Sequence, residues 1–302
     1  MTKISRRTRA NFLLLLVAIV WGSAFVAQRV AAQSMDPFFF NGVRFLFGAA
    51  ILAPLSKGAY TRIAGKGLQG IALAGVLLFG ASALQQIGIQ FTTAGNAGFI
   101  TGLYVVLVPV LLAVFWQERS PWLVWFAVVL AVIGMFLLST GGGFRLAKGD
   151  SLEFAGAFLW GFHVIVIGRL VRSVPVFSLA AGQYLVCGLL NLVVAGFTSG
   201  IAFPAGTLAW WPIAYTGVLS IALGYTLQAI AQMDASPVDT SILLSLEAVF
   251  AALFGWILLG ENLSPVQLLG CGLMLVGILA SQLTPVAHQQ SNTDQQISFR
   301  NR

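Results

Sequence analysis

The chain has 302 residues, of which 58% are hydrophobic and 8% are charged, and its formal net charge is +7. Soluble domains carry about 25% charged residues, so a soluble fold is excluded because too few charges are available to cover its surface. The high apolar content excludes a disordered chain, and the presence of only two cysteines excludes a disulfide-stapled secreted domain. The remaining class is an integral membrane protein.

Ten apolar runs follow one another along the chain and predict an all-α membrane protein with ten transmembrane helices. Each run has about 20 residues, the length that a helix needs to cross a hydrocarbon core of about 30 Å, whereas a membrane strand needs about 10 alternating residues. In chain order, we expect helices over residues 12–32, 37–55, 68–90, 95–116, 121–140, 151–171, 177–198, 210–232, 236–259 and 265–283.

Several helix starts carry capping signals. A serine followed by proline is typical of an N-cap and first helical position, because serine accepts from a free backbone N–H and proline has none to leave unpaired. The three such pairs are Ser120-Pro121, Ser236-Pro237 and Ser264-Pro265. Asp150 and Glu153 have the spacing of a capping box. Glu118 and Glu261 precede two of the Ser-Pro pairs, and we interpret both as structural residues beside a helix N-terminus.

Most of the basic residues fall on one predicted face of the membrane. With ten helices, 12 of the 16 Lys and Arg residues share this face: Lys3, Arg6, Arg7, Arg9, Lys57, Arg62, Lys66, Arg119, Arg169, Arg172, Arg300 and Arg302. The opposite face has Arg29, Arg145 and Lys148. The positive-inside rule therefore predicts a multi-pass protein of the cytoplasmic (inner or plasma) membrane with both termini in the cytoplasm. The positive charge indicates attraction to anionic lipid headgroups of the bilayer, not nucleic-acid binding.

The chain also contains an internal repeat. A shift of 143 positions aligns Gln85 with Gln228 and Glu118 with Glu261, and a shift of 139 aligns Trp21-Gly22 with Trp160-Gly161. The repeat divides the chain into residues 1–143, 149–285 and a polar tail, 286–302, that we expect to be disordered and cytoplasmic. Because each half has five helices, an odd number, the second half must be inverted relative to the first. Inverted repeats with a site at their interface recur in secondary transporters.

The motifs of both halves resemble the drug/metabolite transporter superfamily, and within it the EamA family of ten-helix carriers. The resemblance covers about residues 10–285 and departs at Ala248, where many relatives have proline. The motifs that carry it are Ala18 to Phe25 in the first helix, Arg44-Phe45-Leu46 in the second, Ser245 to Ala252 and Leu259 to Ser264 in the second half, and Gly270 and Gly277 in the last helix.

The resemblance implies two inverted five-helix repeats and a central cavity lined mainly by helices one, three, four, six, eight and nine. It also implies a secondary transporter that moves small organic metabolites, with amino acids or related compounds as the first expectation and export as the expected direction. A multidrug exporter and a lipid-handling membrane protein remain alternatives. The oligomeric state is left open.

Enzyme chemistry has no support in the sequence. It contains no CxxC, HExxH, GxSxG or Walker motif, and its two histidines, His163 and His288, are too few for a typical metal site. We therefore expect no catalytic activity, no metal and no cofactor; coupling to a proton gradient is the one ion-dependent feature that we consider.

Three ionisable residues inside predicted spans are candidates for the site, because such residues are costly at membrane depth and face a bundle interior or a wet cavity. Glu247 is a candidate for proton coupling or for contact with a cationic group, and the alternative is a hydrogen bond to a neighbouring helix. Arg44 could bind a substrate carboxylate, or pair with a helix end or with Glu247. His163 is a candidate cavity residue, with packing as the alternative.

Polar and aromatic residues at repeat-related positions complete the candidate site. Gln85 and Gln228 are expected either to line the cavity or to join helices by hydrogen bonds. Tyr104 is the repeat counterpart of Glu247, which suggests that both face the same space, and Gln183 is the counterpart of Arg44. The remaining candidates are aromatic walls, for which packing or anchoring at the interface is the alternative: Trp21, Tyr184 and Tyr225.

Overall fold

A computed structural model describes residues 5–56, 63–92, 94–141, 148–198, 210–259 and 263–283, and every regular element within these ranges is a helix. The helices are α1 (Arg6–Ala32), α2 (Pro37–Leu52), η1 (Ala53–Ser56), α3 (Gly65–Phe91), α4 (Ala94–Gly102), α5 (Tyr104–Trp116), α6 (Trp122–Thr140), α7 (Asp150–Leu170), α8 (Val176–Thr198), α9 (Trp211–Tyr215), η4 (Thr216–Tyr225), α10 (Thr226–Ala231), α11 (Pro237–Leu244), α12 (Glu247–Leu259) and α13 (Pro265–Gln282). The expected tail 286–302, residue 143 and Glu261 lie outside the described residues.

The predicted all-α membrane fold is confirmed. In the described part of the chain, nine helical segments are long and apolar enough to cross a bilayer, and a shorter apolar helix spans Trp122–Leu138. These ten segments follow the ten predicted ranges, with ends that differ by a few residues. The largest difference is at α1, which begins at Arg6, six residues before the predicted start, because the side chain of Ser5 caps it by accepting from the Thr8 N–H.

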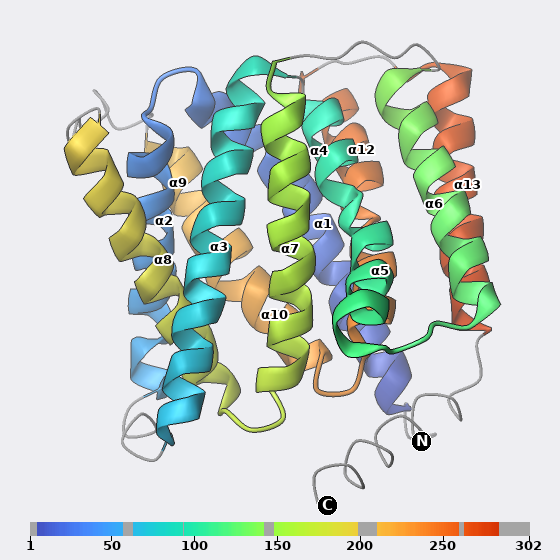
Figure 1. The fold of residues 1–302 in the computed structure, drawn as a ribbon. Coiled ribbons are helices and arrows are strands. Elements are labelled where there is room, and N and C mark those ends of the chain that lie inside the picture. Colours follow the sequence, from blue (N-terminus) through green and yellow to red (C-terminus); the bar gives the residue numbers. More distant parts are fainter. Residues whose placement is uncertain are drawn as a thin grey trace, which may run out of the picture.

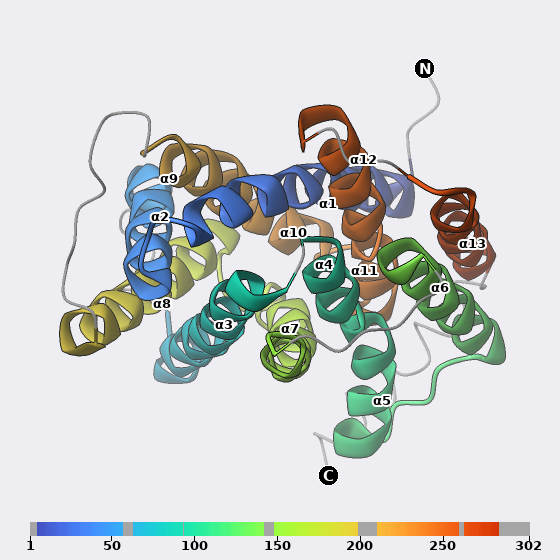
Figure 2. The same ribbon diagram turned by 90° about the horizontal axis from the view of Figure 1, so that it is seen from above.

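The two halves of the chain are inverted and interlocked. Figure 1 shows that α1 begins at the lower end of the bundle, whereas α7, its counterpart in the second half, begins at the upper end. α1 packs against α12 and η4 of the second half, and α7 packs against α3, α4 and α5 of the first. Viewed from above, α6 and α13 form one end of the bundle, and α2, α8 and α9 form the other (Figure 2). The pairs α6–α13 and α2–α8 therefore each join one helix of the first half to one of the second.

Glycines allow the helices of one such pair to approach closely. At the crossing of α6 and α13, a Cβ atom at Gly134 would lie 2.6 Å from the Gly270 carbonyl oxygen, and one at Gly270 would lie 2.7 Å from the Leu138 nitrogen. Small residues are the usual means of close helix packing in membranes, where lipid provides no hydrophobic driving force for association.

Two of the expected continuous helices are broken, at equivalent places in the two halves. The fourth span is divided into α4 and α5 at Leu103, and the ninth into α11 and α12 at Ser245 and Leu246. Leu103 and Leu246 are 143 positions apart, which is the repeat shift. The Ser245 hydroxyl donates to the Ile242 carbonyl at 2.7 Å, a local hydrogen bond of the kind that disturbs helices. Gly102, with its low helix propensity, precedes the other break.

The eighth span also departs from a regular helix. Its middle, Thr216–Tyr225, is a π-helix, in which each turn is wider than in an α-helix. Pro109 lies inside the continuous helix α5.

Helix capping follows the sequence at two of the four expected positions. Ser236 and Ser264 cap α11 and α13 as predicted, and Gln267 completes a capping box with Ser264. The other two expectations are wrong. No side chain caps α6, whose N-cap residue is Pro121, and α7 starts after Gly149, with Asp150 and Glu153 inside the helix. Asp150 and Glu153 are instead buried against neighbouring helices.

Candidate functional site: a central cavity between the two repeats

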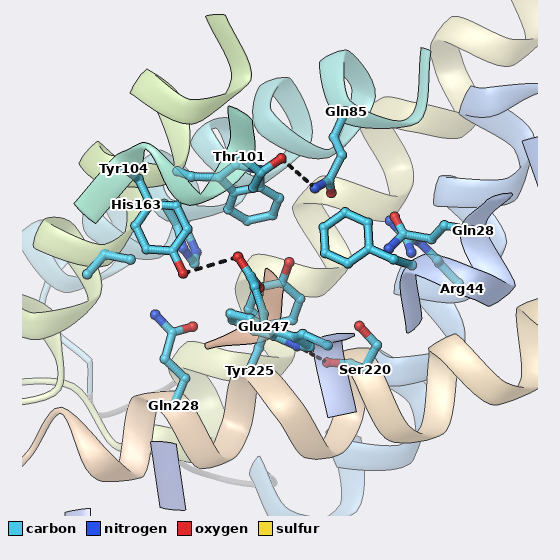
Figure 3. A pocket seen from close by; sticks show the side chains of 14 residues that line it. Gln28, Arg44, Gln85, Thr101, Tyr104, His163, Ser220, Tyr225, Gln228 and Glu247 are labelled. Carbon is cyan, nitrogen blue, oxygen red and sulfur yellow. Dashed lines mark hydrogen bonds between the residues drawn. The ribbon is translucent and has the colours of Figure 1, made fainter. Parts of the chain in front are cut away.

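A cavity of about 500 Å³, counting the part that opens to solvent, lies between the two halves (Figure 3). Its walls come from α1, α3, α4, α5, α7, η4, α10 and α12, which are the six expected spans, and from Arg44 of α2. Eight of the ten candidate residues line it: Trp21, Arg44, Gln85, Tyr104, His163, Tyr225, Gln228 and Glu247. Gln183 and Tyr184 do not line it and contact residues that do.

Glu247 and Tyr104 meet directly in the cavity. The Tyr104 hydroxyl donates to Glu247 Oε1 at 3.2 Å, and both side chains are buried. Each is the first residue after a helix break, so the two breaks bring these repeat counterparts to the same space. On the other side of Glu247, a Cβ atom at Gly22 would lie 2.8 Å from the Glu247 carbonyl oxygen, so this glycine lets α1 approach α12.

Arg44 supplies a buried positive charge to the cavity wall. Its guanidinium carbon lies 4.7 Å from the ring centroid of Phe40 and 5.3 Å from that of Phe45, positions that stabilise a cation over an aromatic face. Its Nε has no hydrogen-bond partner among the described residues. The expected alternative, an ion pair with Glu247, does not form: the ion pair found in the described part of the chain joins Arg169 and Glu118.

His163, which lines the cavity, forms a buried pair with Gln183, which lies behind it. His163 Nε2 lies 2.8 Å from Gln183 Oε1. Because an amide oxygen only accepts hydrogen bonds, the Nε2–H of the ring is the donor. Gln183 therefore orients His163 and has no contact with the cavity, which places it in a supporting position.

Aromatic rings cluster around Tyr225 in the part of the cavity wall next to His163. The Trp21 ring centroid lies 4.5 Å from that of Tyr225, and Trp160 stacks on Tyr225 at 5.9 Å with an interplanar angle of 17°. Tyr184 lies behind Tyr225, at 6.2 Å between ring centroids, and its hydroxyl is 3.2 Å from the Thr226 hydroxyl oxygen. Tyr184 thus supports the aromatic wall from the second layer.

The two glutamines lie at the cavity surface and also take part in hydrogen bonds that connect helices. Gln228 Nε2 donates to Gln232 Oε1 at 3.1 Å, and Gln232 Nε2 donates to the Val164 carbonyl at 2.9 Å, which joins α10 to α7. Gln85 Nε2 donates to Thr101 Oγ1 at 3.1 Å.

The Gln85 interaction leads to a buried carboxylate that the sequence interpretation missed. Thr101 Oγ1 donates to Glu153 Oε2 at 3.1 Å, so α3, α4 and α7 are joined by one chain of hydrogen bonds. Glu153 is 1% exposed, and its position near a helix start led to its interpretation as a cap. The signal that could have found it is a second glutamate in an apolar span, since such residues rarely face lipid.

Six further lining residues were not among the candidates: Phe25, Gln28, Thr101, Trp160, Val164 and Ser220. Trp160 could have been found, because its repeat counterpart Trp21 was a candidate. Within the described ranges, no three His, Cys, Asp or Glu side chains come together as a metal site would require.

The chain is similar to known transport proteins over nearly its whole length. The model of the EamA-like transporter family matches residues 8–140 and 147–282. A protein described as an uncharacterized transporter from Archaeoglobus fulgidus is 32% identical over 92% of this chain and 87% of its own. The threonine/homoserine exporter RhtA of Escherichia coli K12 is 29% identical, over 90% of each chain.

A relative of lower sequence identity and a solved structure are also similar to this chain. The S-adenosylmethionine/S-adenosylhomocysteine transporter of Chlamydia trachomatis serovar D is 25% identical over 89% of this chain and 87% of its own. A solved crystal structure of another protein superposes with a TM-score of 0.76, covers 91% of this chain and 96% of its own, and is 20% identical, so it supports the fold alone.

Proposed function

Because this chain belongs to the EamA-like transporter family, and so is a multi-pass membrane transporter, we propose that it is a secondary carrier of amino acids or closely related metabolites. The observation that carries the proposal is a cavity wall with a guanidinium, Arg44, and a carboxyl group, Glu247, that form no ion pair with each other. Figure 3 shows Arg44 on one side of the cavity and Glu247 near its centre.

Such a pair of charges matches a zwitterion. The planar guanidinium of Arg44 fits a carboxylate through two parallel hydrogen bonds, and Glu247 attracts an ammonium group. A bound zwitterion would supply each of these two buried charges with a group of opposite charge. The pairing would offset the cost of holding unpaired charges at membrane depth. A cargo with only one of the two charges would leave the other protein charge unpaired.

The relatives support the same class of cargo. Threonine, homoserine, S-adenosylmethionine and S-adenosylhomocysteine, after which two of them are named, all contain an α-ammonium group and a carboxylate. The common part of these molecules is the part that Arg44 and Glu247 suit, whereas the rest of each molecule differs.

Transport is proposed to proceed by alternating access. The cavity lies between inverted halves, and the two broken spans, α4–α5 and α11–α12, contribute Thr101, Tyr104 and Glu247 to it. Rocking of one half against the other would open the cavity to each side in turn. Export across the cytoplasmic membrane is the proposed direction, supported by a relative that is named as an exporter. The proposed orientation, with both termini in the cytoplasm, is supported by the distribution of Lys and Arg. Protons are the proposed coupling ion.

Counterflow in proteoliposomes tests the cargo class. A panel would contain radiolabelled amino acids, the amines that lack the carboxylate and the acids that lack the amino group. We expect saturable exchange of amino acids and little exchange of either single-charge analogue. Arg44→Gln should raise the KM of amino acids about 10- to 100-fold, because a charge-assisted hydrogen bond to a desolvated carboxylate is lost. Exchange of no amino acid by folded protein would contradict the proposal.

The export of organic cations is a second candidate, favoured by the aromatic wall of Trp21, Tyr225 and Trp160. Aromatic faces together with one carboxyl group are typical of sites for hydrophobic cations. A lipophilic quaternary ammonium compound added to the same panel separates the two: its saturable transport, with no exchange of amino acids, would favour this candidate.

A further inference from the structure

Trp21 and Trp160 occupy equivalent positions in the two repeats, but their indole N–H groups differ. Trp21 Nε1 donates to the Ser220 carbonyl at 3.1 Å, within the π-helix of the eighth span. Trp160 also lines the cavity, yet its buried Nε1 has no hydrogen-bond partner among the described residues. A buried donor without a partner is rare and calls for an explanation.

An acceptor without a partner lies one helical turn further along α7. His163 Nε2–H donates to Gln183, so in the neutral ring the other nitrogen, Nδ1, has a free lone pair. This Nδ1 is buried and has no partner in the described part of the chain. The rings of Trp160 and His163 are 5.9 Å apart between centroids and nearly perpendicular, and both contact Tyr225. Two neighbouring rings that line the cavity thus carry, respectively, a donor and an acceptor that have no partner among the described residues.

The chemistry of this pair selects among cargo groups. A carboxylate only accepts and would leave His163 Nδ1 unpaired, whereas an ammonium group only donates and would leave Trp160 Nε1 unpaired. A hydroxyl group accepts from the indole N–H and donates to the imidazole nitrogen, and so it satisfies both. We propose that Trp160 and His163 bind a hydroxyl group of the cargo. This inference rests on the proposed function and narrows its cargo to hydroxylated amino acids, with Arg44 and Glu247 binding the two charges.

Wild-type protein in proteoliposomes provides the first test. The probes are L-threonine and two compounds of similar size without the hydroxyl: L-2-aminobutyrate, which has hydrogen in its place, and L-valine, which has a methyl group. We expect kcat/KM for threonine counterflow to exceed that of both by about 10- to 100-fold, because the analogues leave two buried polar groups unpaired. The serine and alanine pair should show the same order.

Three variants locate the effect. Trp160→Phe removes the free donor and His163→Leu removes the free acceptor, and each should reduce the threonine preference to less than about threefold. The matched control is Trp21→Phe, which removes an indole N–H that is already bonded to Ser220. It should lower transport of threonine and 2-aminobutyrate by the same factor and keep their ratio. Ligand-induced shifts in the unfolding midpoint would report binding independently of transport.

The outcomes separate this inference from the proposed function. Exchange of threonine, valine and 2-aminobutyrate at similar rates would keep the amino-acid carrier and overturn the hydroxyl site, since a water molecule would then fill it equally well for all three. Exchange of none of these amino acids would contradict the proposed function itself. A wild-type preference that survives in Trp160→Phe and His163→Leu would place the recognition of the hydroxyl elsewhere and overturn the assignment.

Discussion

Glu247 shows how one residue serves both structure and the proposed transport. It is 3% exposed, begins α12 and accepts a hydrogen bond from Tyr104 of the other half of the chain. A carboxyl group at membrane depth that faces a cavity is a candidate to carry a proton. From the sequence, proton coupling and a hydrogen bond to a neighbouring helix were both open roles for Glu247. The hydrogen bond from Tyr104 makes the two roles compatible, because a change in the protonation of Glu247 would act directly on a contact between the repeats.

The Glu247→Gln variant tests coupling at the residue scale. Glutamine keeps the shape and the acceptor for Tyr104 but carries neither a charge nor an exchangeable acid proton. We expect amino-acid uptake driven by a pH gradient to fall to the rate seen without a gradient, whereas counterflow continues with a KM about tenfold higher, since one hydrogen bond to the ammonium loses its charge. Initial rates in proteoliposomes with and without the gradient measure both effects.

The control for this variant is Glu118→Gln, which removes a carboxylate that is paired with Arg169 and lies outside the cavity. It should keep the full response to the gradient. Gradient-driven transport that persists unchanged in Glu247→Gln would exclude this residue as the coupling site.

At the scale of elements, the helix pairs between the two halves hold the cavity in shape. The pair α6–α13 touches through backbone at Gly134 and Gly270. The hydrogen bonds from Gln85 through Thr101 to Glu153 join α3 and α4 of the first half to α7 of the second. In the proposed alternating-access cycle, the break at Leu103 would let α4 change its tilt relative to α5, and rocking of the halves would have to loosen this chain of hydrogen bonds.

Gly270→Val tests the close packing of α6 and α13. The new side chain would collide with Gly134 and Leu138 backbone atoms, which cannot move aside as a flexible side chain would. We expect destabilisation of about 1–3 kcal/mol, seen as a lower unfolding midpoint in detergent. The control is Gly272→Val on the same helix, where an added Cβ meets no atom within 4 Å. Equal midpoints for the two variants would show that the crossing tolerates a larger separation.

At the scale of the whole molecule, two exposed turns allow the proposed orientation in the membrane to be tested. Exposed Ser173, in the turn between α7 and α8, lies on the face that carries Arg169 and Arg172, and exposed Ser34, between α1 and α2, lies on the other. Figure 1 places these two turns at opposite ends of the bundle. In the proposed orientation, which rests on the positive-inside rule, the face of Ser173 is cytoplasmic.

Labelling of an introduced cysteine tests this orientation in intact cells. A membrane-impermeant thiol reagent should label Ser34→Cys from outside and should label Ser173→Cys only after the membrane is opened. The wild-type protein is the control, because its own thiols, Cys187 and Cys271, lie within α8 and α13. Labelling of both variants from the same side would contradict the topology, and a reversed pattern would contradict the orientation.

Part of this protein could be predicted from sequence because the bilayer imposes simple requirements. A span must be about 20 apolar residues long and helical, so hydropathy was enough to predict ten helices, and the repeat was enough to predict their inversion. The same repeat placed Tyr104 opposite Glu247, because equivalent positions in inverted halves meet near their common axis. Eight of the ten candidate residues therefore lie on the cavity wall.

Only the tertiary structure decided the remaining features. Hydropathy does not reveal helix breaks, and so it missed those at Leu103 and Ser245 and the π-helix that carries Ser220. Hydropathy also could not separate residues of the cavity wall from residues behind it, because a span that is apolar on all sides has no periodic face that marks the interior. For this reason Gln183 and Tyr184 were chosen as cavity candidates although they lie behind the wall. Nor could it distinguish Trp21, whose N–H is bonded, from Trp160, whose N–H is free, since the two repeats differ there only in what the neighbouring backbone offers.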